Sequence, residues 1–270
     1  MTAMTDPIVL QAHEWLPVDR APDGAPVALL VHGIGGWYRT WWRVGPALAE
    51  RGWRVVAVDQ LGHGRSPRID GTVGVEDLAA AVGAVIDGMM APVDLLLGHS
   101  LGAAVAIELV HRRRGIARRL ALEDPPSVTR ADDTEFQRHF ESEVLAARAD
   151  AEAEVRRVLS DNPRWLEEDA RQDVEGRAMV DLEGIMASLR ANTGVRVLEL
   201  AAQLTVPTLF LLADEERSVV GAARQQLLDS LPAGVRALGF DSGHVVHRDR
   251  FDEYLAALLA WLDEPVSVAS

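Results

Sequence analysis

Short apolar runs alternate with longer amphipathic stretches through the first half of the chain. Each run is rich in branched residues and bounded by Gly, Pro or Asp, which is typical of buried strands. The runs are Val27–Val31, Val55–Val58, Val93–Leu97 and Leu120–Leu122. Helices are expected between them, over roughly Thr40–Arg51, Val75–Met90 and Leu101–Arg113. This alternation, with strands apolar on both faces, predicts an α/β fold with a parallel sheet covered by helices.

The same alternation returns near the C-terminus. Strands are expected at Thr208–Leu212 and Val235–Phe240, and helices at about Val219–Leu231 and Arg250–Leu262. Before Pro17, the stretch Ile8–Leu16 alternates more regularly between apolar and polar positions. That pattern favours an antiparallel hairpin at the edge of the sheet.

The middle of the chain has a different pattern. Residues 127–200 are dense in Asp, Glu and Arg, carry apolar residues at helical spacing and contain no strand-like run. This predicts several helices inserted between two strands as a cap over the C-terminal edge of the sheet; the alternative is that they only extend the helical layer. The predicted division is a core of residues 1–126 and 201–270 and a cap of residues 127–200. The acidic excess of the cap is expected on a solvated face, where it would weakly repel an anionic substrate.

Composition narrows the classes of function. The 270 residues are 48% hydrophobic and 25% charged, as in an ordinary globular domain. The absence of Cys excludes disulfides, Cys-based metal sites and a thiol nucleophile. All 27 cationic side chains are Arg, which excludes a Schiff-base Lys and a Walker-type phosphate loop. The net charge of −14 disfavours nucleic-acid and anionic-membrane partners.

No targeting pattern is visible at the start of the chain. Met1–Gln11 lacks a basic segment followed by an apolar one, and the longest apolar runs, such as Ala91–Gly98, are too short to span a bilayer. We therefore expect a cytoplasmic protein that is a monomer or homodimer and whose partner is a small molecule.

The sharpest chemical signal is Gly98-His99-Ser100-Leu101-Gly102, between an apolar strand and an Ala-rich helix. A Gly-x-Ser-x-Gly in that setting predicts a nucleophile elbow, a tight turn that exposes a serine hydroxyl at its tip. Glycines flank the serine because larger side chains would clash in so tight a turn. The N-terminus of the following helix favours the negative charge that develops there.

A second glycine-rich turn supports this interpretation. Gly33-Ile34-Gly35-Gly36 follows the first long strand, where the second half of an oxyanion hole is expected. Two fixed N–H groups, those of Ile34 and Leu101, would stabilise the alkoxide formed in acyl transfer. The alternative is an ordinary glycine turn between a strand and a helix.

The general base is expected to be a histidine late in the chain. His244 follows the last predicted strand and precedes the last helix, so it lies at the same sheet edge as Ser100. His247 is the rival, although it fits the start of the helix better. His32, His63 and His99 adjoin glycines in turns and are expected to form structural hydrogen bonds.

Together these residues resemble the α/β-hydrolase family over nearly the whole chain. Besides the elbow and the His-Gly-x-Gly-Gly turn that begins at His32, the segment from Asp59 to Ser66 is similar to the family's D-x-x-G-x-G-x-S segment. The resemblance implies a mostly parallel sheet of eight strands, a helical cap inserted after the sixth strand, and a Ser–His–acid triad that needs no cofactor and no metal.

The acid is where the chain departs from the family pattern. Most members place an Asp three residues after a Gly at the end of the seventh strand; here Ala213 replaces the Gly and Glu216 fills the Asp position, with Asp214 nearby. The sixth strand ends in Glu123-Asp124-Pro125, which is similar to the Glu-x-Pro of zearalenone-type lactonases. We favour Glu123 as the triad acid and keep Glu216, Asp214 and Asp124 as alternatives, because any carboxylate that reaches the His Nδ1–H would serve.

The substrate pocket is expected near the oxyanion turn. Aromatic residues crowd the segment after it, at Trp37, Tyr38, Trp41 and Trp42. Trp37 or Tyr38 is expected to face the pocket, with at least one of the other two in the core. Gly33 from the turn and Trp165 from the cap complete the predicted substrate-binding set.

The sequence therefore predicts a serine hydrolase that cleaves a carboxylic ester, with a lactone as a favoured subclass. Carbon–carbon bond hydrolysis, amide hydrolysis and cofactor-free peroxidase activity would use the same triad. Epoxide hydrolases and haloalkane dehalogenases are disfavoured because their nucleophile is a carboxylate. The alternative from another class is a receptor-like member whose cap closes on a ligand without turnover.

Overall fold

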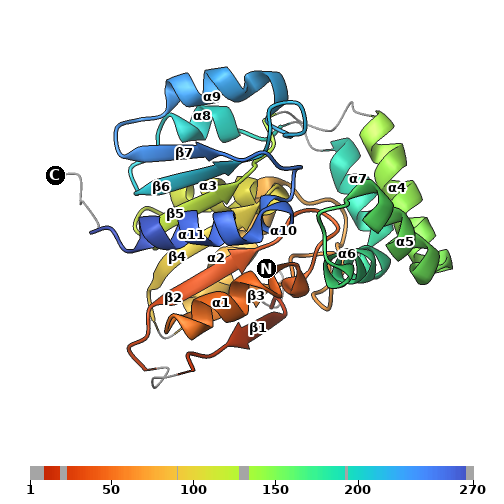
Figure 1. Cartoon of the computed structure of the whole chain (residues 1–270), viewed down its shortest axis with the longest axis horizontal. Coiled ribbons are helices and arrows are strands. Elements are labelled where there is room, and N and C mark those ends of the chain that lie inside the picture. Colours follow the sequence, from red (N-terminus) through yellow and green to blue (C-terminus); the bar gives the residue numbers. More distant parts are fainter. Residues whose placement is uncertain (1–8, 19–22, 90, 128–133, 192–193, 266–270) are drawn as a thin grey trace, which may run out of the picture.

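The computed structural model describes residues 9–18, 23–89, 91–127, 134–191 and 194–265. Over these residues the chain forms one sheet of seven strands in the order β1-β3-β2-β4-β5-β6-β7, shown in Figure 1. The strands are β1 (Ala12–Trp15), β2 (Val27–Val31), β3 (Arg54–Val58), β4 (Val93–His99), β5 (Ala117–Glu123), β6 (Thr208–Leu212) and β7 (Val235–Gly239). All neighbours are parallel except β1, which pairs antiparallel with β3.

The six parallel strands lie where the apolar runs predicted them, but the edge of the sheet differs. The predicted hairpin is a single strand, β1; Ile8 lies outside the described residues, and the N–H of Gln11 donates to the side chain of Ser66 instead of to a strand (2.8 Å). The described residues thus contain seven strands where the family resemblance implied eight.

Successive residues of each central strand face opposite sides, so each side has its own apolar layer. Leu29 and Val31 of β2 pack with the helices α2 (Val75–Gly88) and α3 (Leu101–Arg112). Ala28 and Leu30 pack on the other side. The elements on that side are η1 (Tyr38–Trp41), α1 (Val44–Glu50) and α11 (Phe251–Leu262). The predicted helix over Thr40–Arg51 is therefore broken into η1 and α1.

The segment between β5 and β6 contains helices only. They are α4 (Thr134–Ala149), α5 (Ala151–Asp161), α6 (Glu167–Met179), α7 (Leu182–Ala191) and α8 (Val197–Ala201). Figure 1 shows α4 to α7 gathered at one end of the molecule. Their apolar side chains form two small clusters separate from the layers on the sheet. In contrast, α8 packs its Val197 and Leu200 into the main layer beside α3.

The remaining helical elements follow β6 and β7. They are η2 (Gly221–Ala223), α9 (Arg224–Ser230) and the short α10 (Val246–Asp249), which leads into α11. Among the described helices, none is both long and apolar enough to cross a membrane.

The strand order creates a crevice at one sheet edge. From β2 the chain continues to β3 on one side, and β4 then returns to the other side of β2. In parallel sheets, ligands bind outside the carboxyl ends of the strands at such a reversal. The turns after β2 and β4, which carry Ile34 and Ser100, meet there.

Candidate active site

Ser100 occupies the strained turn that the motif predicted. Its φ of 52° and ψ of −119° put a non-glycine residue in a sparsely populated backbone region, directly between β4 and α3. The glycines around it are required by contact: a Cβ at Gly98 would lie 2.3 Å from the carbonyl oxygen of Gly102, and one at Gly102 would lie 2.1 Å from that of Val31. The strand, turn and helix thus hold Ser100 in one position.

The turn after β2 lies against this elbow. A Cβ at Gly33 would meet the Cβ of Ser100 at 3.0 Å, which shows how closely the two turns approach. Ile34 and Leu101 both line the same cavity as Ser100. Within the described residues, neither of their N–H groups donates to another backbone group, and Leu101 is the first residue of α3. Both amides are therefore available to an acceptor in the cavity.

His244 contacts Asp124. The distance from His244 Nδ1 to Asp124 Oδ2 is 2.6 Å; the carboxylate is fully buried, whereas the His244 side chain remains 28% exposed in the cavity. An ionised carboxylate only accepts hydrogen bonds, so Nδ1 carries the ring proton and Nε2 is left as an acceptor. This is the protonation that a general base needs toward a serine hydroxyl.

The loop after β6 holds Asp124 in place. The N–H of Ala213 (3.2 Å), the hydroxyl of Ser218 (2.5 Å) and the N–H of Val219 (3.0 Å) all donate to its carboxylate. The loop after β6 therefore supplies hydrogen-bond donors to Asp124, the residue that follows β5. Two other candidate acids on this loop do not contact His244: Glu216 is exposed, and Asp214 accepts from the N–H of Glu216.

The expectation that Glu123 contacts His244 is wrong. Glu123 is fully buried, and its two carboxylate oxygens lie 2.8 and 2.9 Å from Nδ1 of His247. The N–H of His247 also donates to Glu123 (2.9 Å). The reason is the end of β5: Glu123, its last residue, faces the same side as Ala121, toward α11, whereas Asp124 follows the strand with a φ of 39° and contacts the loop after β6 and His244.

The Glu123–His247 pair holds a proton between its two members. The second ring nitrogen of His247, Nε2, lies 3.1 Å from the carbonyl oxygen of Thr40, which can only accept. Nε2 therefore carries a proton, and a further proton lies between Nδ1 and the carboxylate. Burial raises the pKa of Glu123, but the charges of His247 and His99 and the hydrogen bonds from His247 outweigh it and hold that pKa below its ordinary value.

The histidines beside glycines form structural hydrogen bonds, as expected. His32 donates to the carbonyl of Gly33 (2.7 Å) and accepts from the N–H of Gln60 (3.1 Å), and burial lowers its pKa to about 4. Burial, reinforced by the charge of His32, lowers the pKa of His63 to about 3. His99 lies 3.2 Å from the carbonyl of His244 through Nε2, and burial lowers its pKa well below the ordinary value.

The segment from Asp59 to Ser66 also has a structural role. The carboxylate of Asp59 accepts from the N–H groups of Tyr38 (2.7 Å) and Arg65 (2.9 Å). Burial raises the pKa of Asp59, against the effect of these two bonds. Gly64 has a φ of +53°, and a Cβ there would lie 2.2 Å from Asp59 Oδ2. The segment thus secures the start of η1 rather than reaching the cavity.

The cavity has a volume of about 270 Å³ and contains two of the four predicted substrate-binding residues. Gly33 and Trp165 line it, but Trp37 and Tyr38 do not. Trp37 is buried and directs its indole N–H to the carbonyl of Gln172 on α6 (3.1 Å), and Tyr38 stacks on His13 of β1 (4.5 Å between ring centroids). Trp41 is in the core, as expected of one member of this group.

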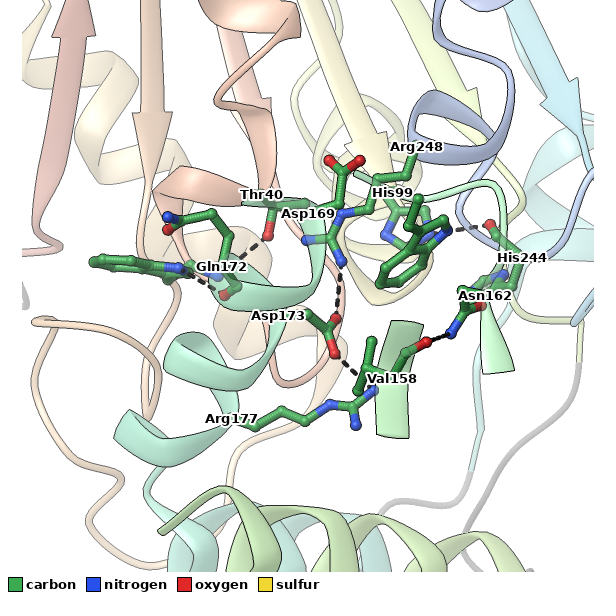
Figure 2. A network of polar contacts seen from close by, with 12 residues as sticks. Thr40, His99, Val158, Asn162, Asp169, Gln172, Asp173, Arg177, His244 and Arg248 are labelled. Carbon is green, nitrogen blue, oxygen red and sulfur yellow. Dashed lines mark hydrogen bonds and ion pairs between the residues drawn. The ribbon is translucent and has the colours of Figure 1, made fainter. Parts of the chain in front are cut away.

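Sequence reasoning missed the charged residues of the cavity wall. These are Glu143, Asp173, Arg177 and Arg248. Figure 2 shows three of them in a line, from Arg248 through Asp173 to Arg177. Glu143, Asp173 and Arg177 belong to highly charged helices whose sequences predict solvated surfaces. Only the fold shows that these three side chains line the cavity. Among the described residues, the cavity wall included, no group of three or more His, Cys, Asp or Glu could hold a metal ion.

Comparisons with known proteins identify the family of the chain. The sequence profile described as "Alpha/beta hydrolase family" matches residues 28–257. The chain is 30% identical over 220 residues to RutD of Variovorax paradoxus (strain S110), which carries the name carbamate hydrolase provisionally; the match covers 78% of this chain and 81% of RutD.

Two solved structures share the fold. E-2-(acetamidomethylene)succinate hydrolase has a TM-score of 0.75 at 22% identity, covering 94% of this chain and 95% of that one. The enol-lactonase of Burkholderia xenovorans LB400 has a TM-score of 0.73, also at 22% identity, over 94% and 97% of the two chains.

Proposed function

Since this chain belongs to the alpha/beta hydrolase family, we propose that it is a serine hydrolase that cleaves a carboxylic ester through an acyl-enzyme on Ser100. The observation that carries the proposal is the 2.6 Å contact between His244 and the buried Asp124, in the cavity that Ser100 also lines. Asp124, one of the four carboxylates considered from the sequence, takes the role of the triad acid.

The proposed reaction begins with a proton transfer. Nε2 of His244 takes the proton of the Ser100 hydroxyl as the oxygen attacks the ester carbonyl. Asp124 keeps the ring in the required tautomer and stabilises the imidazolium that forms. The N–H groups of Ile34 and Leu101 hold the oxyanion. His244 then protonates the leaving alcohol and activates the water that hydrolyses the acyl-enzyme.

The preference for lactones loses its first basis, since it depended on Glu123 acting as the acid. The likeness to an enol-lactonase shows a shared fold, and a lactone is a cyclic ester that the same residues would open. Lactones therefore remain among the proposed substrates but are not favoured over other carboxylic esters.

The test is hydrolysis of phenyl and p-nitrophenyl esters of several acyl lengths and of a set of lactones. We expect turnover by the wild type and a loss of about 10³-fold or more in the Ser100→Ala variant. The matched control is Ser127→Ala, because Ser127 lies beyond β5 and, among the residues that the structure describes, its hydroxyl bonds to the carbonyl of Val220 alone (2.8 Å). Tight ligand binding without turnover would contradict the proposal and favour the receptor-like reading.

A second candidate is hydrolysis of a carbon–nitrogen bond. The observation in its favour is the 30% identity to RutD over 220 residues. The same serine and histidine would serve, but His244 would have to protonate a poorer leaving group. An anilide and a phenyl ester with the same acyl group separate the two candidates. The ester proposal expects the ratio of kcat/KM for the ester to kcat/KM for the anilide to exceed the ratio of their uncatalysed hydrolysis rates.

A further inference from the structure

Arg248 is a buried cation in the wall of the cavity. It lies on α10, four residues after His244, and its side chain is only 3% exposed. Its Nη1 donates to Oδ1 of Asp173 on α6 (2.9 Å). Its Cζ lies 4.6 Å from the centroid of a Trp165 ring. Figure 2 shows the guanidinium of Arg248 joined to the carboxylate of Asp173.

The neighbours of Arg248 are themselves fixed. The indole N–H of Trp165 donates to Asp249 Oδ1 (2.9 Å), and the other oxygen of Asp249 accepts from the N–H of Gly243. Asp173 lies between Arg248 and Arg177, whose Nη2 is 3.0 Å from Asp173 Oδ2. The cap residues and the His244 loop thus hold the guanidinium in one orientation, so a ligand would not have to order it.

Most of the donors of this guanidinium are unused. In the part of the chain described, Nε of Arg248 is buried without a hydrogen-bond partner, and Asp173 is bonded through Nη1 alone. A buried charged donor without an acceptor is costly, and such groups are nearly always satisfied. The edge formed by Nε and Nη2 is the one that receives both oxygens of a carboxylate.

The charges around Arg248 leave room for an added anion. Among the described residues, Arg248 shares its one ion-pair partner, Asp173, with Arg177, which also pairs with Glu143 and lies 3.8 Å from Glu154. Glu143, which also lines the cavity, lies 2.7 Å from Arg177 Nη1 and 3.1 Å from Arg157 Nη2, so it is already shared by two arginines. Physiological salt screens most of the repulsion between the acidic outer surface and an anion in the cavity, because those charges are farther apart than the Debye length. The local contact at Arg248 therefore decides which ligand group is accepted.

The rest of the cavity is largely apolar. Its apolar lining includes Val75, Leu101, Leu189, Val195 and Val219. A ligand that fills it would place hydrocarbon against these side chains and a planar anion against Arg248.

We propose that Arg248 is a specificity-determining residue that binds a carboxylate of the substrate through its Nε–Nη2 edge. The substrate class is a small ester that carries a free carboxylate at the end of its acyl chain or alcohol. The inference deepens the proposed function and rests on it for the reaction, but not for the binding of the anion.

The experiment compares two esters that differ only in this group. Phenyl hexanoate and phenyl hydrogen adipate have acyl chains of equal length, ending in a methyl group and a carboxylate. With spontaneous hydrolysis subtracted, we expect the wild type to favour the adipate ester in kcat/KM by about 10- to 100-fold, the range typical of a charged hydrogen-bonding group left paired or unpaired. The Arg248→Met variant is expected to lose this preference.

Two further variants separate the effect of geometry from that of charge. Arg248→Lys keeps a positive charge near Asp173 but lacks the planar fork, so it is expected to lose most of the preference. Arg156→Met removes an exposed arginine from the cap helix α5 and is expected to leave the ratio of the two kcat/KM values unchanged. The ratio is measured within each variant, so a general loss of folded enzyme does not alter it.

Binding of adipate to the Ser100→Ala variant, measured by calorimetry, is independent of turnover. We expect binding that disappears in Ser100→Ala/Arg248→Met. Equal hydrolysis of both esters by the wild type, with no adipate binding, would overturn the inference and leave the proposed function standing. Arg248-dependent binding of adipate by a protein that hydrolyses neither ester would uphold the carboxylate site and overturn the ester-hydrolase function.

Discussion

Two histidine–carboxylate pairs stand side by side at the end of β5, and they differ in what surrounds them. His244 lines the cavity and keeps 28% of its side chain exposed, although its partner Asp124 is fully buried. Glu123 and His247 are almost completely enclosed, at 0% and 2% exposure. Neighbouring residues in sequence thus supply one pair open to a reactant and one closed to it, because β5 ends at Glu123 and the chain turns at Asp124, which has a φ of 39°.

The difference extends to the second nitrogen of each ring. In His247, Nε2 is occupied by the carbonyl of Thr40, so the pair joins β5, the start of α10 and the segment after the oxyanion turn. In His244, no described residue forms a hydrogen bond with Nε2, and that nitrogen can take a proton. In the proposed mechanism, proton transfer therefore belongs to the open pair, whereas the closed pair joins neighbouring loops.

Breaking the open pair is expected to have the largest effect. The Asp124→Asn variant keeps the shape of the residue, and Asn tolerates the positive φ of 39° found here. Its amide would offer a donor to Nδ1 of His244 and favour the wrong tautomer. We expect kcat to fall by about 10⁴-fold at neutral pH, measured on a phenyl ester.

The control for this change is Glu216→Gln, an exposed former candidate acid, which is expected to retain the wild-type kcat. If Asp124→Asn kept kcat within tenfold of the wild type while Glu216→Gln lost it, the assignment of the acid to β5 would be wrong.

Breaking the closed pair is expected to lower stability instead of the rate. The Glu123→Gln variant leaves His247 without its carboxylate in a buried site. Removal of one partner of a buried ion pair costs about 3–5 kcal/mol in the free energy of unfolding. Urea unfolding at pH 7 measures this loss, and kcat/KM per folded molecule is expected to change much less than in Asp124→Asn.

The double variant Glu123→Gln/His247→Asn sharpens the test. Its loss of stability should be less than the sum of the two single losses, since the residues interact directly. A Glu123→Gln protein with full stability and a kcat as low as that of Asp124→Asn would show that the closed pair takes part in the reaction.

Most of the fold could be predicted because its signals are local. The six parallel strands are short apolar runs, and the elbow is marked by Gly98 and Gly102, whose lack of a Cβ is required by backbone contacts within the same turn and β2. The positions of Ser100 and His244 at one sheet edge follow from parallel strand order, which the alternation of strands and helices already implied.

The partner of each histidine could not be predicted in this way. Glu123 and Asp124 are adjacent and chemically equivalent, and their choice between His244 and His247 depends on where α10 packs. The alternation along β5 was a usable signal: Ala121 and Glu123 share a face, and the aromatic residues of α11 cover that face. Arg248 gave no signal of its own, because its burial depends on Trp165 and Asp173, which lie in the helical segment between β5 and β6.

Unlike the two paired histidines, buried His32 has no carboxylate partner among the described residues, and this difference affects how stability depends on pH. The pKa of His32 falls from 6.5 to about 4 on folding because burial disfavours its charged form. Between pH 6.5 and 4, His32 is therefore protonated in the unfolded state and neutral in the folded state. The contribution of neutral His32 to the free energy of unfolding is fully present above pH 6.5 and is lost as the pH falls toward 4.

For His32 this amounts to about 3 kcal/mol at most. Urea unfolding between pH 7 and 4.5 should show a smaller decline in His32→Gln than in the wild type. Glu123 behaves differently, since its lowered pKa affects stability only as the pH falls below its ordinary value of 4.5. A decline of equal size in both proteins above pH 4.5 would exclude His32 as its cause.

The smallest expected effect comes from loosening the open pair without removing it. Ser218 donates to Asp124 Oδ1 at 2.5 Å, whereas the N–H groups of Ala213 and Val219 still hold the carboxylate when the hydroxyl is lost. A hydrogen bond to a charged group contributes about 1.5–3 kcal/mol, and part of that is recovered as Asp124 bonds more strongly to His244. We expect Ser218→Ala to lower kcat on a phenyl ester by about tenfold or less. An unchanged kcat in Ser218→Ala would indicate that the hydroxyl of Ser218 is not needed to hold Asp124 in position. The control is Ser230→Ala at the end of α9, whose hydroxyl donates to the carbonyl of Leu227 and forms no other hydrogen bond within the described residues.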